Sequence, residues 1–173
     1  MTISGGGVER GIRHGAAESA HTVTTPALDH SVAALRALLT GDFDTFRRLH
    51  AELRPAGNVA FSVALTSAFI HAVDQHFGES PSPADVINFV AEARARYQTT
   101  AQRETADDAE QAIRTALGED RLFNGMSGRA IGAAQTAMLF ALVQEDGLSP
   151  SGIDTLLARA AEKADEYFRR RGR

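Results

Sequence analysis

Four residues near the middle of the chain have side chains that can hold a metal ion or move a proton. They are His71, Asp74, His76 and Glu79. Two histidines that bind one metal from the same helix stand four residues apart, as in the H-E-x-x-H motif, because this spacing puts both on one face. His71 and His76 are five residues apart and point in different directions. The pattern therefore favours a solvated helix end over a metal site.

A second candidate is the glycine-bearing segment Gly125-Met126-Ser127-Gly128-Arg129. Backbone N–H groups at the start of a helix, helped by an arginine, can hold a phosphate or a carboxylate. However, the spacing fits neither a P-loop nor the dinucleotide-binding fingerprint, and no strand is predicted before the segment. We interpret it as a tight turn followed by a closely packed helix, and we expect no cofactor.

Carboxylates occur in pairs shortly after two glycines, as Asp42 with Asp44 and as Glu119 with Asp120. Paired carboxylates can do acid–base work when they are buried close together. These pairs stand where helices are predicted to begin, and negative charge is favourable there because of the helix dipole. The dipole explains them without catalysis.

An arginine cluster lies at the C-terminal end of the chain. Its members are Arg169, Arg170, Arg171 and Arg173. Proteins that bind nucleic acid neutralise phosphates with a basic face, whereas this chain has a formal net charge of −4. Cations near the end of a helix are also favoured by its dipole. Nucleic-acid binding through these arginines is thus an alternative that the composition does not favour.

The length and the composition of the chain indicate one globular domain. The 173 residues suffice for a sizeable core, and the shares of hydrophobic (43%) and charged (23%) residues are typical of folded proteins. Cysteine is absent, which excludes disulfides and thiol chemistry. Lys163 is the single lysine, and this bias together with abundant alanine and glycine indicates a GC-rich bacterial genome. No apolar run has signal-peptide or membrane-spanning length, so we expect a soluble cytoplasmic protein without membrane contact.

Apolar residues recur at steps of three and four along most of the chain, which predicts an all-α fold. Capping signals mark helix starts at Thr25-Pro26, Ser82-Pro83, Thr105 and Ser149-Pro150. Glycines mark helix ends at Gly41, Gly118 and Gly147. The helices are expected at about 26–40, 43–53, 59–77, 83–97, 106–117, 129–144 and 150–170, with a brief helical turn near Phe123. Residues 1–24 lack this periodicity, so we expect a disordered N-terminal arm and one domain over residues 25–173.

Two parts of the chain resemble each other. Ala34–Asp42 is echoed by Ala112–Glu119, which is one residue shorter. Farther along, Ala60–Ile70 aligns without a gap with Ala130–Phe140. The same order and rough spacing indicate a duplicated structural unit.

The resemblance continues to the last helix of each part. Ser82-Pro83 and Ser149-Pro150 are each followed by similarly spaced apolar residues. Copy one then covers about residues 25–97 and copy two about residues 105–170. We predict a compact helical bundle made of two pseudo-symmetric copies of a three-to-four-helix unit.

The middle helix of each copy is apolar nearly all the way round, which is typical of a helix covered on several sides. We predict that the two middle helices pack against each other across a pseudo-twofold axis, as in a fused homodimer. The residues expected in this central packing, or at an interface, are Phe61, Leu65, Phe69, Val73, Ile131, Met138 and Leu139.

The leading hypothesis is a non-enzymatic interaction or regulatory protein, whose partner is an unknown protein or a second copy of the chain. It depends on the apolar helices, because surplus apolar surface often marks a partner site. One alternative is a nucleic-acid-binding regulator that uses the arginine cluster. The other is an enzyme or ligand carrier whose site is assembled from distant residues, such as His71, Glu79 and Arg129.

Overall fold

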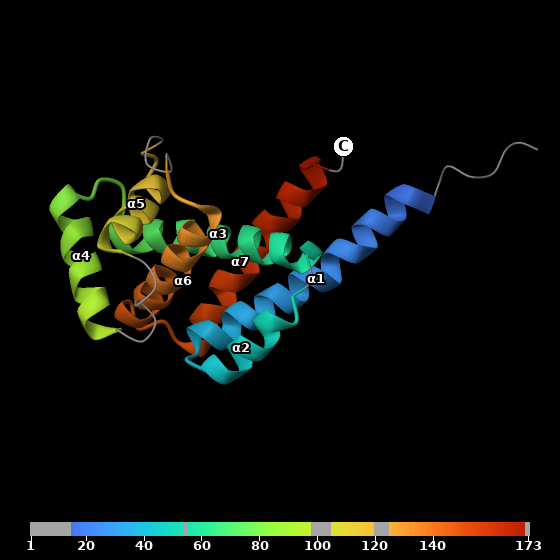
Figure 1. Cartoon of the computed structure of the whole chain (residues 1–173), viewed down its shortest axis with the longest axis horizontal. Helices are drawn as coiled ribbons and strands as arrows, with labels where there is room; N and C mark the ends of the chain where they lie inside the picture. The colour runs from blue at the N-terminus through green and yellow to red at the C-terminus, as the bar shows by residue number, and fades with distance from the viewer. Residues whose placement is uncertain (1–14, 54, 98–104, 120–124, 172–173) are drawn as a thin grey trace, which may run out of the picture.

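The structure, a computed structural model, describes residues 15–53, 55–97, 105–119 and 125–171. These residues form seven α-helices and no strand, which confirms the all-α fold (Figure 1). The helices are α1 (Gly15–Leu39), α2 (Phe43–Ala51), α3 (Pro55–Phe77), α4 (Pro83–Arg96), α5 (Ala106–Ala116), α6 (Gly128–Glu145) and α7 (Pro150–Arg171). The brief turn predicted near Phe123 lies outside the described residues.

The predicted capping boxes are present at the starts of α4 and α5. At α4, the hydroxyl of Ser82 accepts a hydrogen bond from the N–H of Asp85, and the Asp85 carboxylate accepts one from the N–H of Ser82 at 2.7 Å. Thr105 and Asp108 make the same reciprocal pair at 3.1 and 3.2 Å. Each box satisfies two N–H groups that would otherwise lack partners at the start of a helix.

The two copies also end their first helices in the same way. Gly41 and Gly118 have positive φ angles of 78° and 94°. After each glycine the chain folds back, so that the N–H of Asp42 donates to the carbonyl of Ala37 and that of Glu119 to the carbonyl of Arg114. This is the Schellman arrangement, in which glycine avoids the strain that a side chain would meet. The predicted helix ends are confirmed.

Two helix starts differ from the expectation. Helix α1 begins at Gly15, so Pro26 lies inside the helix and the start predicted there is wrong. Residues 15–24 include several alanines and a glutamate, which favour a helix without showing apolar periodicity. Helix α3 begins at Pro55, where proline is well suited to the first turn, and not at Val59. Residues 1–14 of the predicted arm lie outside the described residues.

Helix α3 is the centre of the bundle, in contact with α1, α5, α6 and α7. The predicted packing of the two middle helices against each other is confirmed, since α3 lies against α6. The predicted central residues that are buried are Phe61, Leu65, Phe69, Val73, Met138 and Leu139. Ile131, near the start of α6, is partly exposed.

The contacts between helices follow a twofold pattern. If α1 is exchanged with α5, α3 with α6, and α4 with α7, each substantial contact among these six helices becomes another observed contact. The α1–α3 contact corresponds to α5–α6, the α3–α7 contact to α4–α6, and the α1–α7 contact to α4–α5. The last helix of each copy therefore packs on the first and middle helices of the other copy. The pattern agrees with the duplication hypothesis, although a common origin of the two copies stays a prediction.

Figure 1 shows the consequence for the shape of the molecule. Helices α4 and α5 lie together at one end, while α1 and α2 lie toward the other end. Helix α3 runs between these ends, and at 23 residues it is about 35 Å long. Because α7 is joined to α6 but covers α1 and α3, neither copy forms a separate lobe.

One ion pair breaks the twofold pattern. Nε of Arg36 on α1 donates to the Asp154 carboxylate on α7 at 2.7 Å. The matching positions in the other half are Arg114 on α5 and Ile87 on α4. Nε of Arg114 is buried and has no hydrogen-bond partner among the residues that the structure describes, and Ile87 is 44% exposed. The second half keeps the arginine and lacks its carboxylate.

The difference in burial between two apolar side chains predicts how much each contributes to the free energy of unfolding. Phe69→Ala is expected to lower the free energy of unfolding by about 3–5 kcal/mol, because the ring is fully buried and its loss leaves a cavity. The matched control Ile87→Ala, at an exposed position, is expected to cost about 1 kcal/mol or less. Urea unfolding followed by circular dichroism measures both. Equal losses would contradict the assignment of α3 as the central helix.

The broken ion pair provides a test of the twofold pattern. Ile87→Asp is expected to be more stable than Ile87→Asn by about 0.2–1 kcal/mol, because the new carboxylate can accept from Nε of Arg114. The gain should vanish when Arg114 is replaced by leucine. Urea unfolding of the four variants forms a double-mutant cycle, and a gain that persists without Arg114 would refute the match between the halves.

Candidate functional site

The C-terminal ends of α3 and α6 meet through a pair of polar side chains. Nδ1 of His76 lies 2.6 Å from Oδ1 of Asp146, and both side chains are largely covered, at 24% and 27% exposed. When the alignment of the two middle helices is extended to their ends, His76 and Asp146 occupy the same position. The contact therefore joins equivalent places in the two copies, as expected near a twofold axis.

A second polar group stands beside it. The carboxylate of Glu145 accepts a hydrogen bond from the hydroxyl of Tyr97 at 2.7 Å and one from the guanidinium of Arg96 at 2.6 Å. Glu145 ends α6, whereas Arg96 and Tyr97 stand at the end of α4. The group ties the last turn of α4 to the last turn of α6.

The protonation of these groups is set by the same contacts. The Tyr97 hydroxyl, and then the Arg96 guanidinium, lower the pKa of Glu145 by stabilising its anion, against the opposing effect of burial. Burial and the neighbouring Glu145 anion raise the pKa of Tyr97. At neutral pH the carboxylate is therefore charged and the phenol keeps its proton, so the arrangement stabilises structure and holds no free base.

An open hollow of about 360 Å³ lies between the end of α3 and the outer turns of α4. It is lined by His76, Phe77, Pro81, Asp85, Asn88, Phe89 and Glu92. The set combines three aromatic rings with two carboxylates and one amide. Aromatic and acidic side chains therefore share one concave surface here.

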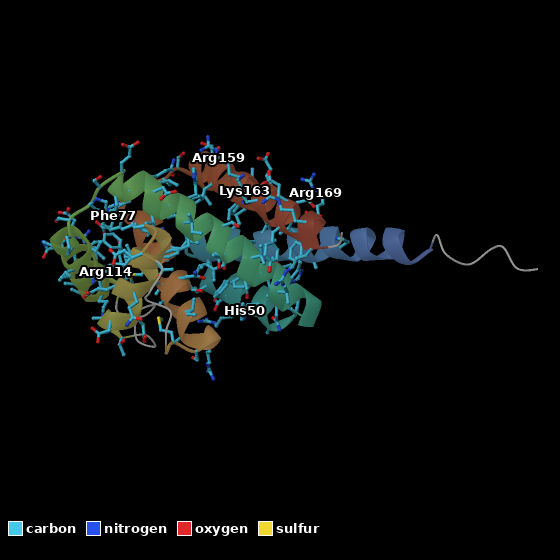
Figure 2. All side chains as sticks on the ribbon, turned by 90° about the horizontal axis from the view of Figure 1, so that it is seen from above. His50, Phe77, Arg114, Arg159, Lys163 and Arg169 are labelled. Carbon is cyan, nitrogen blue, oxygen red and sulfur yellow. The ribbon has the colours of Figure 1, made fainter. Side chains whose placement is uncertain are left out.

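The three rings of the hollow are packed against one another. The Phe77 and Phe89 rings meet edge to face with their centroids 5.5 Å apart. The imidazole of His76 lies 4.7 Å from the Phe77 ring and 4.8 Å from the Phe89 ring. Edge-to-face packing fixes ring orientation. Figure 2 shows Phe77 at the α4 end of the molecule, with Arg114 on the same side.

The candidate metal-binding residues are not brought together. Nε2 of His71 lies 3.0 Å from the guanidinium of Arg159 on α7, while His76 bonds to Asp146 on α6. The two histidines point to different neighbours, as their spacing predicts. Within the described part of the chain, no group of three histidine or acidic side chains could hold a metal ion.

The dispersed site proposed from His71, Glu79 and Arg129 is not assembled either. Arg129 stands in the first turn of α6, and Glu79 follows the end of α3. The ends of α3 and α6 meet at Asp146, which is seventeen residues beyond Arg129. At 1.5 Å per residue this separation is about 25 Å along the helix, too far for one site.

The glycine-bearing segment and one of the acidic pairs have structural roles. The hydroxyl of Ser127 accepts from the N–H of Ala130 at 3.2 Å and so caps α6. The carboxylate of Asp42 accepts from the N–H of Thr45 and caps α2, and this bond lowers the pKa of Asp42. The turn and dipole interpretations hold at these positions. Asp120 lies outside the described residues.

Two arginines of the C-terminal cluster have partners on their own helix. Arg169 pairs with Asp165 at 2.9 Å, and the guanidinium of Arg171 lies 5.1 Å from the centre of the Tyr167 ring. Figure 2 shows Arg159, Lys163 and Arg169 along the outer side of α7. In the sequence of this helix, Asp165 and other acidic residues stand between them. The surface carries both signs of charge. Arg173 lies outside the described residues, and nucleic-acid binding stays a prediction.

Sequence reasoning missed the polar groups and the hollow at the α4 end. Arg96 and Glu145 are 49 residues apart, and His76 and Asp146 are 70 apart, so no local pattern joins them. The His76–Asp146 contact had a signal in the sequence, because the alignment of the two middle helices places these residues at the same position. The position of Tyr97 just after the last turn of α4 gave no such signal.

No protein family, curated protein or solved structure matches this chain. None of the described helices is long and apolar enough to cross a membrane.

The hydrogen bonds of Glu145 predict a dependence of stability on pH. Because the pKa of Glu145 is lower in the folded chain than in the unfolded chain, its stabilisation is present at neutral pH and is lost as the pH falls through the folded value. Glu145→Gln is expected to cost about 1–2 kcal/mol at pH 7, and the difference from the wild type should shrink toward pH 3.

Urea unfolding between pH 3 and pH 7 measures this difference. Glu162→Gln, at an exposed position of α7, is the matched control and should change little at any pH. A loss of stability in Glu145→Gln that does not vary with pH would show that the charge of Glu145 is not responsible.

Proposed function

We propose that this protein is a non-enzymatic helical interaction protein that binds a second copy of itself through an uncovered strip of α3. The α3 strip consists of Val59, Val63, Thr66 and Ile70. Val59 and Ile70 are 50% and 40% exposed, although they belong to the central helix of the bundle. This exposed apolar surface is the observation that carries the proposal.

The α3 strip is continuous along the helix. Its four residues follow one another at steps of four, three and four, so they share one face. The hydroxyl of Thr66 donates to Gln135 on α6 at 3.1 Å, which places the strip along the seam between α3 and α6. On the α6 side of this seam, Ile131, one turn before Gln135, is only partly buried. The uncovered apolar surface therefore extends over both middle helices.

The chemistry of the α3 strip favours a second copy as the partner. The stretch from Pro55 to Val73 contains no aspartate, glutamate, lysine or arginine. Such a surface has no charge pattern with which to select an oppositely charged protein. In a symmetric dimer a patch on one subunit contacts the same patch on the other, and an uncharged apolar patch can do so without charge repulsion.

The polar groups at the ends of α3, α4 and α6 are bonded to one another, which supports a structural role for them. Glu145, Arg96 and Tyr97 bond to one another, and His76 bonds to Asp146. The central residues suggested as an interface are less suitable, because Phe69, Leu65 and their buried neighbours are engaged in the core. The proposal therefore rests on the outward positions Val59 and Ile70.

The proposal predicts a concentration-dependent dimer that a charge on the α3 strip disrupts. The wild type is expected to sediment as a dimer, and Ile70→Glu as a monomer with an unchanged circular dichroism spectrum, because the interface would bury an unpaired carboxylate. Ile87→Glu is the matched control, since Ile87 is equally exposed but lies on α4. Sedimentation velocity at several concentrations measures all three.

Two results would refute the proposal. One is a wild type that stays monomeric at every concentration tested. The other is a dimer that Ile87→Glu dissociates as readily as Ile70→Glu, which would place the interface elsewhere.

A further inference from the structure

We infer that the hollow between α3 and α4 is a binding site for an organic cation, namely a guanidinium or alkylammonium group. The inference does not depend on the proposed dimer, because the hollow is lined by the end of α3, by Pro81 and by α4, and it shares no residue with the α3 strip. It depends on three observations: the carboxylates of the hollow, its aromatic rings, and the different residues at the matching positions of the other half.

The rim of the hollow carries negative charge that is available to a ligand. Asp85 is held in its anionic form, because hydrogen bonds from Ser82 lower its pKa. Glu92 is exposed, and among the described residues it makes no hydrogen bond or ion pair. His76, the basic group of the lining, is already bonded to Asp146. A cation entering the hollow therefore meets two carboxylates without displacing an arginine or lysine.

The aromatic side of the hollow suits the same ligand. Phe77 is only partly buried, and its ring is fixed edge to face against Phe89. A cation within about 6 Å of an aromatic face is attracted by the ring quadrupole, and a guanidinium can also stack on the ring. A volume of about 360 Å³ admits such a group together with the methylenes that carry it. An anion would find two carboxylates and no free cation.

The matching half of the molecule lacks this lining. The residues equivalent to Phe77, Asp85, Asn88 and Glu92 are Gly147, Gly152, Thr155 and Arg159. Arg159 contacts His71 on α3, whereas the residue equivalent to His71 on α6 is the buried Ala141. Glu92 therefore has no residue on α6 that could play the part that His71 plays for Arg159. Asp85 caps α4 and Phe89 belongs to the core, but Phe77, Asn88 and Glu92 have no similar residue in the other half. The shared architecture does not require these three side chains, which supports a role in binding.

The test uses agmatine as a small guanidinium probe and the capped tripeptide Gly-Arg-Gly as a peptide probe. Nuclear magnetic resonance titration of the backbone amides reports where each probe binds. We expect shifts that saturate at the amides of Phe77, Asn88 and Glu92. The uncharged analogue butylurea should produce none of these shifts at the same concentration.

Variants separate the site from general attraction to an acidic protein. Glu92→Gln should weaken agmatine binding about five- to tenfold through loss of a charge-assisted contact, and Phe77→Leu about two- to fivefold through loss of the ring face. Glu162→Gln removes the same charge from α7 and should leave the affinity unchanged. Each variant should keep the circular dichroism spectrum of the wild type.

The outcomes decide both the site and the source of the cation. A tripeptide that binds at least tenfold more tightly than agmatine supports the site and indicates a basic side chain of a partner peptide. Equal affinities support the site and indicate a free small amine. Shifts spread over the whole acidic surface, or equal weakening by Glu92→Gln and Glu162→Gln, would overturn the inference, as would the absence of binding by both probes at 10 mM.

Discussion

The fold depends on one constraint: α3 is apolar around most of its circumference and must be covered on several sides at once. Helices α1 and α2, from the same half of the chain, supply only part of that cover: α1 packs along α3, while α2 packs on α1 and reaches α3 at Phe61. The missing cover comes from α5, α6 and α7 of the other copy. Because burial of each large apolar side chain contributes roughly 1.5–3 kcal/mol, the packing of α4 and α7 on helices of the opposite half outweighs any surface ion pair of the bundle.

The polar contacts of this protein lie at positions where the two halves carry different residues. The equivalent positions at the ends of α3 and α6 carry His76 and Asp146, an unlike pair that attracts, where two identical residues of a true homodimer would have met like with like. Nε of Arg36 donates to the Asp154 carboxylate, whereas Nε of Arg114 has no partner within the described part of the chain. The aromatic and acidic residues that line the hollow are not repeated at the matching positions of the other half. Architecture is shared between the halves, and the differences between them carry the chemistry that a function can use.

The sequence allowed the all-α fold, the capping boxes at Ser82 and Thr105, and most of the buried middle-helix residues to be predicted, because each depends on residues that are near one another in the chain. The start of α1 was missed since its first turns favour a helix by alanine content and not by an apolar face. The Arg96–Glu145 contact and the hollow could not be predicted. They require knowledge of which helix ends meet, and that is settled by packing over separations of tens of residues.

The exchange of last helices has a consequence for the order in which the chain can fold. Arg36 and its partner Asp154 are 118 residues apart, and α7 can cover α1 and α3 only after residues 150–171 have been synthesised. Until then the ribosome-bound chain presents the apolar side of its central helix to solvent, a state prone to aggregation and recognised by chaperones. Contacts of such long range also slow the final step, since the loop must close before the contact stabilises it. A chain truncated before α7 would therefore lose the cover of both α1 and α3, and not merely one helix at its surface.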